Sequence, residues 1–336
     1  MMIEIWAEAG PCENDIGKAL EYVHAVSAAG AQALKVQWYR PETLVTLDAE
    51  RYDKTSGSAK TQYELFKNSI YPYQRWEPVI DECRQQGIEF IPSVFDTEAA
   101  LVAGELGLKT IKIASGDITY LDLIKVAAKS TNERIAISTG ASTEAEIDSA
   151  YMHATAADYV VLMACHLEYP TPLGEANVAR LYAIGYGWPY SQLGFSDHTP
   201  GIDTIPLAVA AGANVIEKHF TLEANKGYDS DFALDPAGLR NAVLEAQRTL
   251  GLMGNSDLAP TMGERDARLG ARRSLVLTKS LSAGEIVRPN DVAVLRPHHV
   301  DSLSPAALNQ ILTVPLAVDA EAGKPLTREH FPDLVD

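Results

Sequence analysis

NVIEKHF, at residues 214–220, is the last of eight short segments whose composition is typical of buried β-strands. Val215 and Ile216 suit a packed, pleated surface, but Glu217 and His219 follow at alternate positions, and a strand seldom holds such groups against a core without partners. Helix-like stretches separate the eight segments. This alternation predicts a (β/α)8 barrel, with an open doubly wound sheet as the competing fold. The eight segments are 3–9, 33–39, 89–95, 110–115, 134–139, 159–165, 193–198 and 214–220.

The length of 336 residues allows one large domain and a smaller one. We predict a barrel domain with its last helix over 1–254, and a linker of low apolar content over 255–271. A small domain of short strands and single helical turns is expected over 272–336. The long connection over 40–75 follows the second strand, on the side where barrel enzymes bind substrates, and is a candidate lid.

Composition narrows the possible partners. The net charge of -17 argues against nucleic-acid or anionic-membrane binding, although a few local lysines can still bind an anionic small molecule. No apolar run approaches the ~18 residues of a membrane span, and the N-terminus lacks a signal-type segment. The three scattered cysteines, Cys12, Cys83 and Cys165, suggest reduced thiols in a cytoplasmic protein.

Polar residues recur at one parity near the ends of the strand-like segments. Side chains alternate across a strand, so one parity faces the barrel interior and the other faces the helices. Lys218 has the outward parity and is expected to be a solvated or helix-paired cation. Active sites of barrel enzymes lie at the carboxyl ends of the strands, where the inward set would converge. That set is Lys35, Gln37, Lys112, Ser138, Ser196, His198, Glu217 and His219.

Two inward histidines end neighbouring strands. A single strand histidine is usually structural, but neighbouring strands lie ~4.8 Å apart, so His198 and His219 can share a metal ion. Two imidazoles would leave positions open for substrate and water, as a catalytic ion requires. Imidazole with oxygen ligands suits Mn²⁺ or another divalent ion.

Lys35 and Lys112 are inward cations with several possible roles. Each can form an ion pair with Glu8 or Glu217. Together they can also bind an anion, such as a phosphate with a carboxylate. A Schiff-base nucleophile is a further role for Lys112. The hydroxyl donors for an anion would be Ser93, Ser115, Ser138 and Ser196.

The motifs in this order resemble the sialic acid synthase family, the N-acetylneuraminate synthases and relatives that make other nonulosonic acids. The C-terminal segment, with RRSLV, AGE and LRP, resembles the SAF (antifreeze-like) domain of that family. The resemblance covers nearly the whole chain. The motifs are KVQ (35–37), IKIASGD (111–117), ISTGAS (137–142), YPTP (169–172), GFSDHTPG (194–201) and EKHFTLE (217–223).

The resemblance implies a cytoplasmic transferase of carbohydrate biosynthesis, with N-acetylneuraminate synthase as the nearest activity. Such enzymes condense phosphoenolpyruvate with an open-chain aldose, typically an N-acetylated mannosamine, by C–O cleavage. It also implies a divalent metal, Mn²⁺ first and Mg²⁺ or Co²⁺ as alternatives, and a domain-swapped homodimer in which Arg296 reaches the sugar of the partner subunit. Metal ligands would be His198 and His219. Phosphoenolpyruvate contacts would be Lys35, Ser93, Lys112, Ser115, Ser138 and Ser196. Sugar contacts would be Glu8, Gln37, Tyr169 and Asp229, and Glu217, Glu8 or Lys112 would act in catalysis.

Three segments depart from the family pattern, all on the sugar side. EAGPCENDIG (8–17) stands for EIGxNHNG, ACHLEYPTP (164–172) for HCTSxYPTP, and GYDSD (227–231) for a GPDH-like segment. We therefore expect an acceptor other than plain N-acetylmannosamine. The rival interpretations are a metal-dependent hydrolase, a Schiff-base aldolase and a non-catalytic barrel scaffold.

Overall fold

The computed structural model describes residues 3–51, 59–67, 69–223, 229 and 231–334. The chain divides into two compact units, Met1–Gly254 and Asn255–Asp336, each with its own apolar core. Among the described residues, no helix is both long and apolar enough to cross a membrane.

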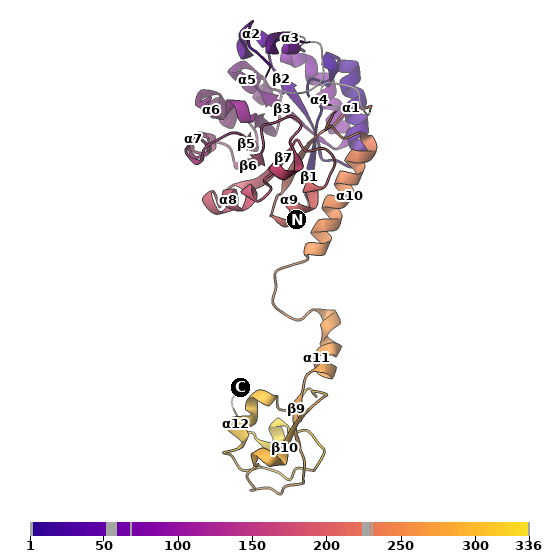
Figure 1. The fold of residues 1–336 in the computed structure, drawn as a ribbon, viewed down its shortest axis with the longest axis vertical. Coiled ribbons are helices and arrows are strands. Elements are labelled where there is room, and N and C mark those ends of the chain that lie inside the picture. The colour runs from indigo at the N-terminus through magenta and orange to yellow at the C-terminus, as the bar shows by residue number, and fades with distance from the viewer. Residues whose placement is uncertain (1–2, 52–58, 68, 224–228, 230, 335–336) are drawn as a thin grey trace. The chain divides into compact units, whose positions relative to one another are not determined.

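The first unit is a closed barrel of eight parallel strands, which confirms the predicted (β/α)8 fold. Each strand pairs with the next along the chain, and β8 pairs with β1, so the sheet has no free edge. Helices surround these strands (Figure 1). The strands are β1 (Glu4–Glu8), β2 (Ala33–Trp38), β3 (Glu89–Val94), β4 (Thr110–Ile113), β5 (Arg134–Ser138), β6 (Tyr159–Cys165), β7 (Gln192–Asp197) and β8 (Val215–His219).

Side-chain caps define where several barrel helices begin. Asp15, Asp96, Thr143 and Asp235 each accept a hydrogen bond from a backbone N–H of the first helical turn, which satisfies a donor that the helix itself leaves unpaired. The helices are α1 (Ile16–Ala29), α4 (Glu77–Gln86), α5 (Thr97–Glu105), α6 (Leu121–Ser130), α7 (Glu144–Ala154), α8 (Arg180–Gly187), α9 (Thr204–Ala210) and α10 (Pro236–Met253).

The candidate lid contains two short helices, α2 (Pro41–Leu44) and α3 (Gln62–Phe66). Residues 52–58 and 68 of this connection lie outside the described residues.

The barrel interior is closed at its N-terminal end by an ion-paired cluster. Arg134 donates hydrogen bonds to Glu4 at 2.7 and 2.9 Å and to Glu89 at 2.8 Å. Burial alone would raise the pKa of Glu4, but the bound guanidinium lowers it. The Arg134 guanidinium also lies 5.3 Å from the centre of the Trp6 ring. We call Glu4, Glu89 and Arg134 the barrel floor.

An apolar layer lies above the floor and fills the barrel. Gly194 of β7 makes room for this layer, because a Cβ there would lie 2.6 Å from Cγ of Met163. The polar inward positions therefore begin only above this layer, at the carboxyl ends of the strands. The layer consists of Trp6, Ala33, Ile91, Ala136, Val161, Met163 and Val215.

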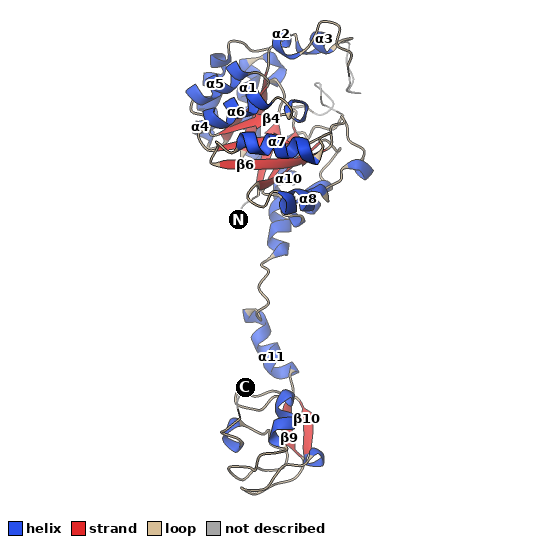
Figure 2. Ribbon diagram, turned by 90° about the vertical axis from the view of Figure 1, so that its left-hand side faces the viewer, coloured by secondary structure: helices blue, strands red, loops and turns tan. Residues whose placement is uncertain are grey.

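The second unit is small and rich in turns (Figure 2). Its sheet has two antiparallel strands, β9 (Ser274–Leu277) and β10 (Val292–Leu295). Its core contains Leu275, Ile311 and Phe331, with α12 (Leu308–Ile311) contributing Ile311. The segment 255–271, which we expected to be a linker, holds a 3-10 turn at Met262–Glu264 and helix α11 (Arg265–Ala271).

Candidate active site

A cavity of about 390 Å³ opens at the carboxyl ends of the barrel strands. Every site residue predicted on the barrel lines it. Arg296 lies in the second unit, directly after β10. The predicted residues that line it are Glu8, Lys35, Gln37, Ser93, Lys112, Ser115, Ser138, Tyr169, Ser196, His198, Glu217, His219 and Asp229.

Strand register brings these side chains together. Glu8 of β1 is paired with Lys35 on one side and with His219 on the other. Ser196 of β7 is paired with Glu217 of β8. Because paired residues on parallel strands have the same parity, these side chains all face inward.

Two lysines and two glutamates form a buried charge cluster. Lys35 binds Glu8, and its Nζ lies 3.3 Å from Oε1 of Glu217. Oε2 of Glu217 lies 3.7 Å from Nζ of Lys112 and has no hydrogen-bond partner among the described residues. Burial alone would raise the pKa of Glu217, but Lys112 and Lys35 lower it to about 2. Glu217 is therefore an anion that balances the two cations.

Hydroxyl and amide groups surround the ammonium group of Lys112. Its Nζ donates to Oγ of Ser138 at 2.7 Å and to the carbonyl of Ile113 at 3.3 Å. Burial lowers the pKa of Lys112, and Lys35 lowers it further, against the opposing effect of Glu217. Oγ of Ser115 accepts a hydrogen bond from the N–H of Gly140 at 3.0 Å. The group offers clustered donors of the type that bind phosphate or carboxylate.

Each of the two histidines has its Nδ1 engaged by an oxygen atom. Nδ1 of His198 donates to the carbonyl of His166 at 2.8 Å, and Nδ1 of His219 donates to Oδ2 of Asp229 at 2.6 Å. A donor at Nδ1 leaves Nε2 as the ligand atom in a neutral imidazole, as in most protein metal sites. The ring centres lie 5.1 Å apart. The donor set therefore fits a divalent cation.

Two family models match this chain. A family model described as "NeuB family" matches residues 22–257, and a SAF domain model matches 272–332. The chain belongs to the NeuB family. The resemblance to sialic acid synthases is thereby confirmed.

Relatives of this NeuB chain carry related names. It is 32% identical to an N,N'-diacetyllegionaminic acid synthase of Legionella pneumophila subsp. pneumophila, over 97% of this chain and 94% of that protein. It is 28% identical to a pseudaminic acid synthase of Helicobacter pylori, over 98% and 97%. The solved N-acetylneuraminic acid synthetase of Leptospira borgpetersenii, in complex with citrate, has a TM-score of 0.71 and 28% identity, covering 80% of this chain and 90% of that one.

Two residues predicted at the sugar side lie beside the histidines of this NeuB barrel. The Tyr169 ring centre is 4.2 Å from that of His198. The carboxylate of Asp229 accepts the hydrogen bond from Nδ1 of His219. Burial alone would lower the pKa of His219, but Asp229, together with Glu8 and Glu217, raises it. Gly227, Tyr228 and Ser230 of the divergent GYDSD segment lie outside the described residues.

The expectation for Lys218 is wrong. Its side chain is fully buried, and Nζ lies 3.0 Å from Oδ2 of Asp197 and also donates to the carbonyl of Thr199. Asp197 accepts further hydrogen bonds from Oγ1 of Thr204 at 2.5 Å and the N–H of Thr199 at 2.9 Å. The outward parity is correct, but the helices cover this face of the barrel, so Lys218 is neither solvated nor paired with a helix carboxylate.

Several residues that line the cavity were not predicted as site residues, among them Asp117 and Cys165. Asp117 lies two residues after Ser115, and burial raises its pKa to about 6. Cys165 ends β6 opposite Ser196, and Leu167 follows it. The parity of Cys165 was a usable signal. Asp117 follows its strand in a 3-10 turn, where alternation no longer applies.

Proposed function

We propose that this NeuB-family chain condenses phosphoenolpyruvate with an open-chain aldose to give a nonulosonic acid and phosphate. The observation that supports this most is a single cavity holding two buried lysines with their serines beside a pair of metal-competent imidazoles. The first group suits an anionic donor, and the second suits a carbonyl acceptor. The names of the relatives are consistent with this reaction.

The donor would bind against Lys35 and Lys112. Their ammonium groups would pair with its phosphate and carboxylate, and Ser93, Ser115, Ser138 and Ser196 would add hydroxyl donors. Carbon 3 of the donor forms the new bond to the aldehyde carbon. Water adds to carbon 2, and cleavage of the bond between carbon 2 and oxygen releases phosphate.

His198 and His219 would hold the metal ion, with Mn²⁺ as the proposed ion and Mg²⁺ or Co²⁺ as alternatives. A bound divalent cation polarises the aldehyde oxygen of the acceptor. The contacts of Asp229 and of the His166 carbonyl orient both rings through Nδ1, so that Nε2 would be the ligand atom.

Proton transfer would fall to a carboxylate of the cavity. Glu217, with a pKa of about 2, is a weak base because two lysines stabilise its anion. Asp117, with a pKa of about 6, can gain and lose a proton near neutral pH. Asp117 is therefore a stronger candidate than Glu217, and Glu8 is already engaged by Lys35 and Gln37.

The acceptor would differ from plain N-acetylmannosamine. A second cavity of about 200 Å³ shares Gln37, Tyr39, Phe66 and Asp229 with the first. Five residues of the divergent 8–17 segment line this second cavity: Ala9, Gly10, Pro11, Glu13 and Asn14. This space suits an aldohexose with an additional substituent, such as a second acylamino group.

Phosphate release from phosphoenolpyruvate tests the proposal. Purified protein with Mn²⁺ is given N-acetylmannosamine, a 2,4-diacylamino hexose and unsubstituted aldoses in parallel, with His219→Ala as the inactive control. We expect release with the diacylamino sugar to exceed that with N-acetylmannosamine. If none of the aldoses in the panel caused phosphate release, the result would support a non-catalytic scaffold. If N-acetylmannosamine were clearly the best acceptor, only the proposal about the acceptor would be refuted.

The pKa of Lys112, which burial lowers, keeps an aldolase as the second candidate. Borohydride treatment in the presence of pyruvate distinguishes the two. A covalent adduct on Lys112 would favour the aldolase, and the synthase predicts none.

The proposal includes a cytoplasmic homodimer in which Arg296 of one subunit completes the site of the other. Three buried free thiols suit a reducing compartment. Mixing subunits tests the dimer: Arg296→Ala and His219→Ala proteins are each expected to be weak or inactive, and a refolded equal mixture should recover about a quarter of wild-type activity, because mixed dimers hold one intact site. No recovery would mean that Arg296 does not act across subunits.

A further inference from the structure

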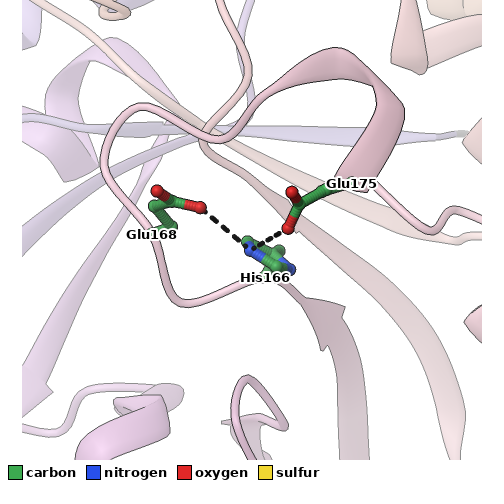
Figure 3. A group of neighbouring side chains, drawn as sticks. All are labelled: His166, Glu168 and Glu175. Carbon is green, nitrogen blue, oxygen red and sulfur yellow. Dashed lines mark ion pairs between the residues drawn. The ribbon is translucent and has the colours of Figure 1, made fainter.

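A histidine and two glutamates that the proposed reaction does not use gather in the loop after β6. Nε2 of His166 lies 3.4 Å from Oε2 of Glu168 and 3.5 Å from Oε2 of Glu175 (Figure 3). One ligand atom from each residue lies within 4.8 Å of the other two. Both glutamates point at the same ring nitrogen, one from each side of the loop.

The distances do not suit hydrogen bonds. N–H···O bonds span about 2.7–3.2 Å, and both contacts are longer. They do match the edges of a coordination polyhedron, because two ligand atoms at ~2.1 Å from one tetrahedral ion are about 3.4 Å apart. The two carboxylates also carry two negative charges, which a divalent cation would cancel. From this geometry we infer that His166, Glu168 and Glu175 form a second site for a divalent transition-metal ion.

The three residues of this site do not line the substrate cavity. Cys165, Leu167 and Tyr169 line the cavity, whereas the alternating residues His166 and Glu168 do not. Both carboxylates are accessible, with side-chain exposures of 28% for Glu168 and 58% for Glu175, so an ion can reach them from solvent. An ion here would not contact the reacting atoms.

The loop nevertheless supports the active site. The carbonyl of His166 accepts from Nδ1 of His198, and the N–H of Thr171 donates to the carbonyl of His198 at 2.9 Å. Tyr169 lies between these two contacts. An ion held by residues 166, 168 and 175 would close this stretch into a loop and fix the backbone that orients His198. Its role is structural, as an ordering ion for the loop.

Imidazole with two carboxylates favours a transition metal over Ca²⁺, because calcium sites use oxygen ligands. The probe is therefore Co²⁺, whose visible absorption reports nitrogen and oxygen ligation. The full chain is stripped with a chelator and dialysed to equilibrium against Co²⁺, and bound ion is counted by elemental analysis.

The decisive comparison uses the His219→Ala background, so the result does not depend on the proposed catalytic metal. We expect one Co²⁺ per chain there, and none after the further change His166→Ala. Glu175→Gln should weaken binding at least about tenfold. Glu105→Gln, at an exposed carboxylate on α5, should keep the ion.

Circular dichroism confirms that each variant is folded, and Glu175→Gln alters only a half-exposed side chain. Equal Co²⁺ binding with and without His166 would overturn the site, as would the absence of binding in the His219→Ala protein. If the proposed catalytic site bound no metal, wild type and His219→Ala would contain equal amounts of Co²⁺. That result would contradict the catalytic metal site and not the site in the loop.

Discussion

Glu217 is the residue on which the charge balance of the cavity depends. Its carboxylate lies within 4 Å of both Lys35 and Lys112. Replacing one partner of a buried ionic cluster commonly costs about 3–5 kcal/mol, because the remaining charges are left unpaired. The cluster is therefore both a binding element and a stability element.

Glu217→Gln tests this balance. We expect a fall of several kcal/mol in the free energy of unfolding, measured by urea denaturation, and a loss of phosphate release of about a hundredfold or more. Gln62→Glu, at the rim of the same cavity, serves as a control for a change of charge outside the cluster. Normal stability and normal turnover in Glu217→Gln would show that the lysines do not need this carboxylate.

Asp117 gives a pH dependence with a definite sign. Burial raises its folded pKa from 3.8 to about 6, so the folded state holds this proton more tightly than the unfolded chain. Wild-type stability should therefore fall relative to Asp117→Asn as pH rises from about 4 to above 6, by roughly 1–3 kcal/mol. Urea unfolding of both proteins from pH 4 to pH 8 measures this difference. A constant difference across that range would contradict the raised pKa.

At the scale of elements, the sequence was sufficient to predict the inward-facing residues at the strand ends. Alternation on β2, β4, β7 and β8 was enough to select Lys35, Lys112, Ser196 and Glu217 as inward residues, since parity on a pleated strand is a local property. Asp117 and the contact between Asp229 and His219 lie in turns, whose course depends on packing far along the chain. Lys218 shows the same limit, because the sequence predicts the face of the strand on which it lies but not that the helices bury its side chain completely.

Buried contacts behind β7 and β8 place the two histidines. Lys218 precedes His219, Asp197 precedes His198, and the two charges bind each other at 3.0 Å. Thr204, in the first turn of α9, joins the same network. The network thus ties both strand ends to one helix.

Lys218→Met should destabilise the fold by about 3–5 kcal/mol, because Asp197 would remain buried without its cation. Removing both charges, in Asp197→Asn with Lys218→Met, should cost less than the sum of the two single changes. Urea denaturation of all four proteins measures this coupling. Additive losses would show that the pair acts only as two separate packing groups.

At the scale of the whole molecule, the two units have separate cores. Met1–Gly254 contains the barrel interior and the strand–helix layer, and Asn255–Asp336 has its own cluster around Leu275 and Phe331. We expect the fragment 1–254 to fold alone, with the circular dichroism of a mixed α/β protein and a cooperative thermal transition. A fragment that is unfolded would show that the barrel requires the second unit.

The barrel floor closes the end of the barrel opposite the substrate cavity. Within the described part of the chain, Glu4, Glu89 and Arg134, with the apolar layer above them, close the barrel on the side away from the strand ends, below Lys35 and Lys112. If the proposed donor binds at Lys35 and Lys112, an acceptor bound nearer the strand ends would cover it, so we predict that the donor binds first and the sugar second. Radiolabelled phosphoenolpyruvate already on the protein should then be carried into product when excess aldose and unlabelled donor arrive together, and its complete dilution would point to another way in.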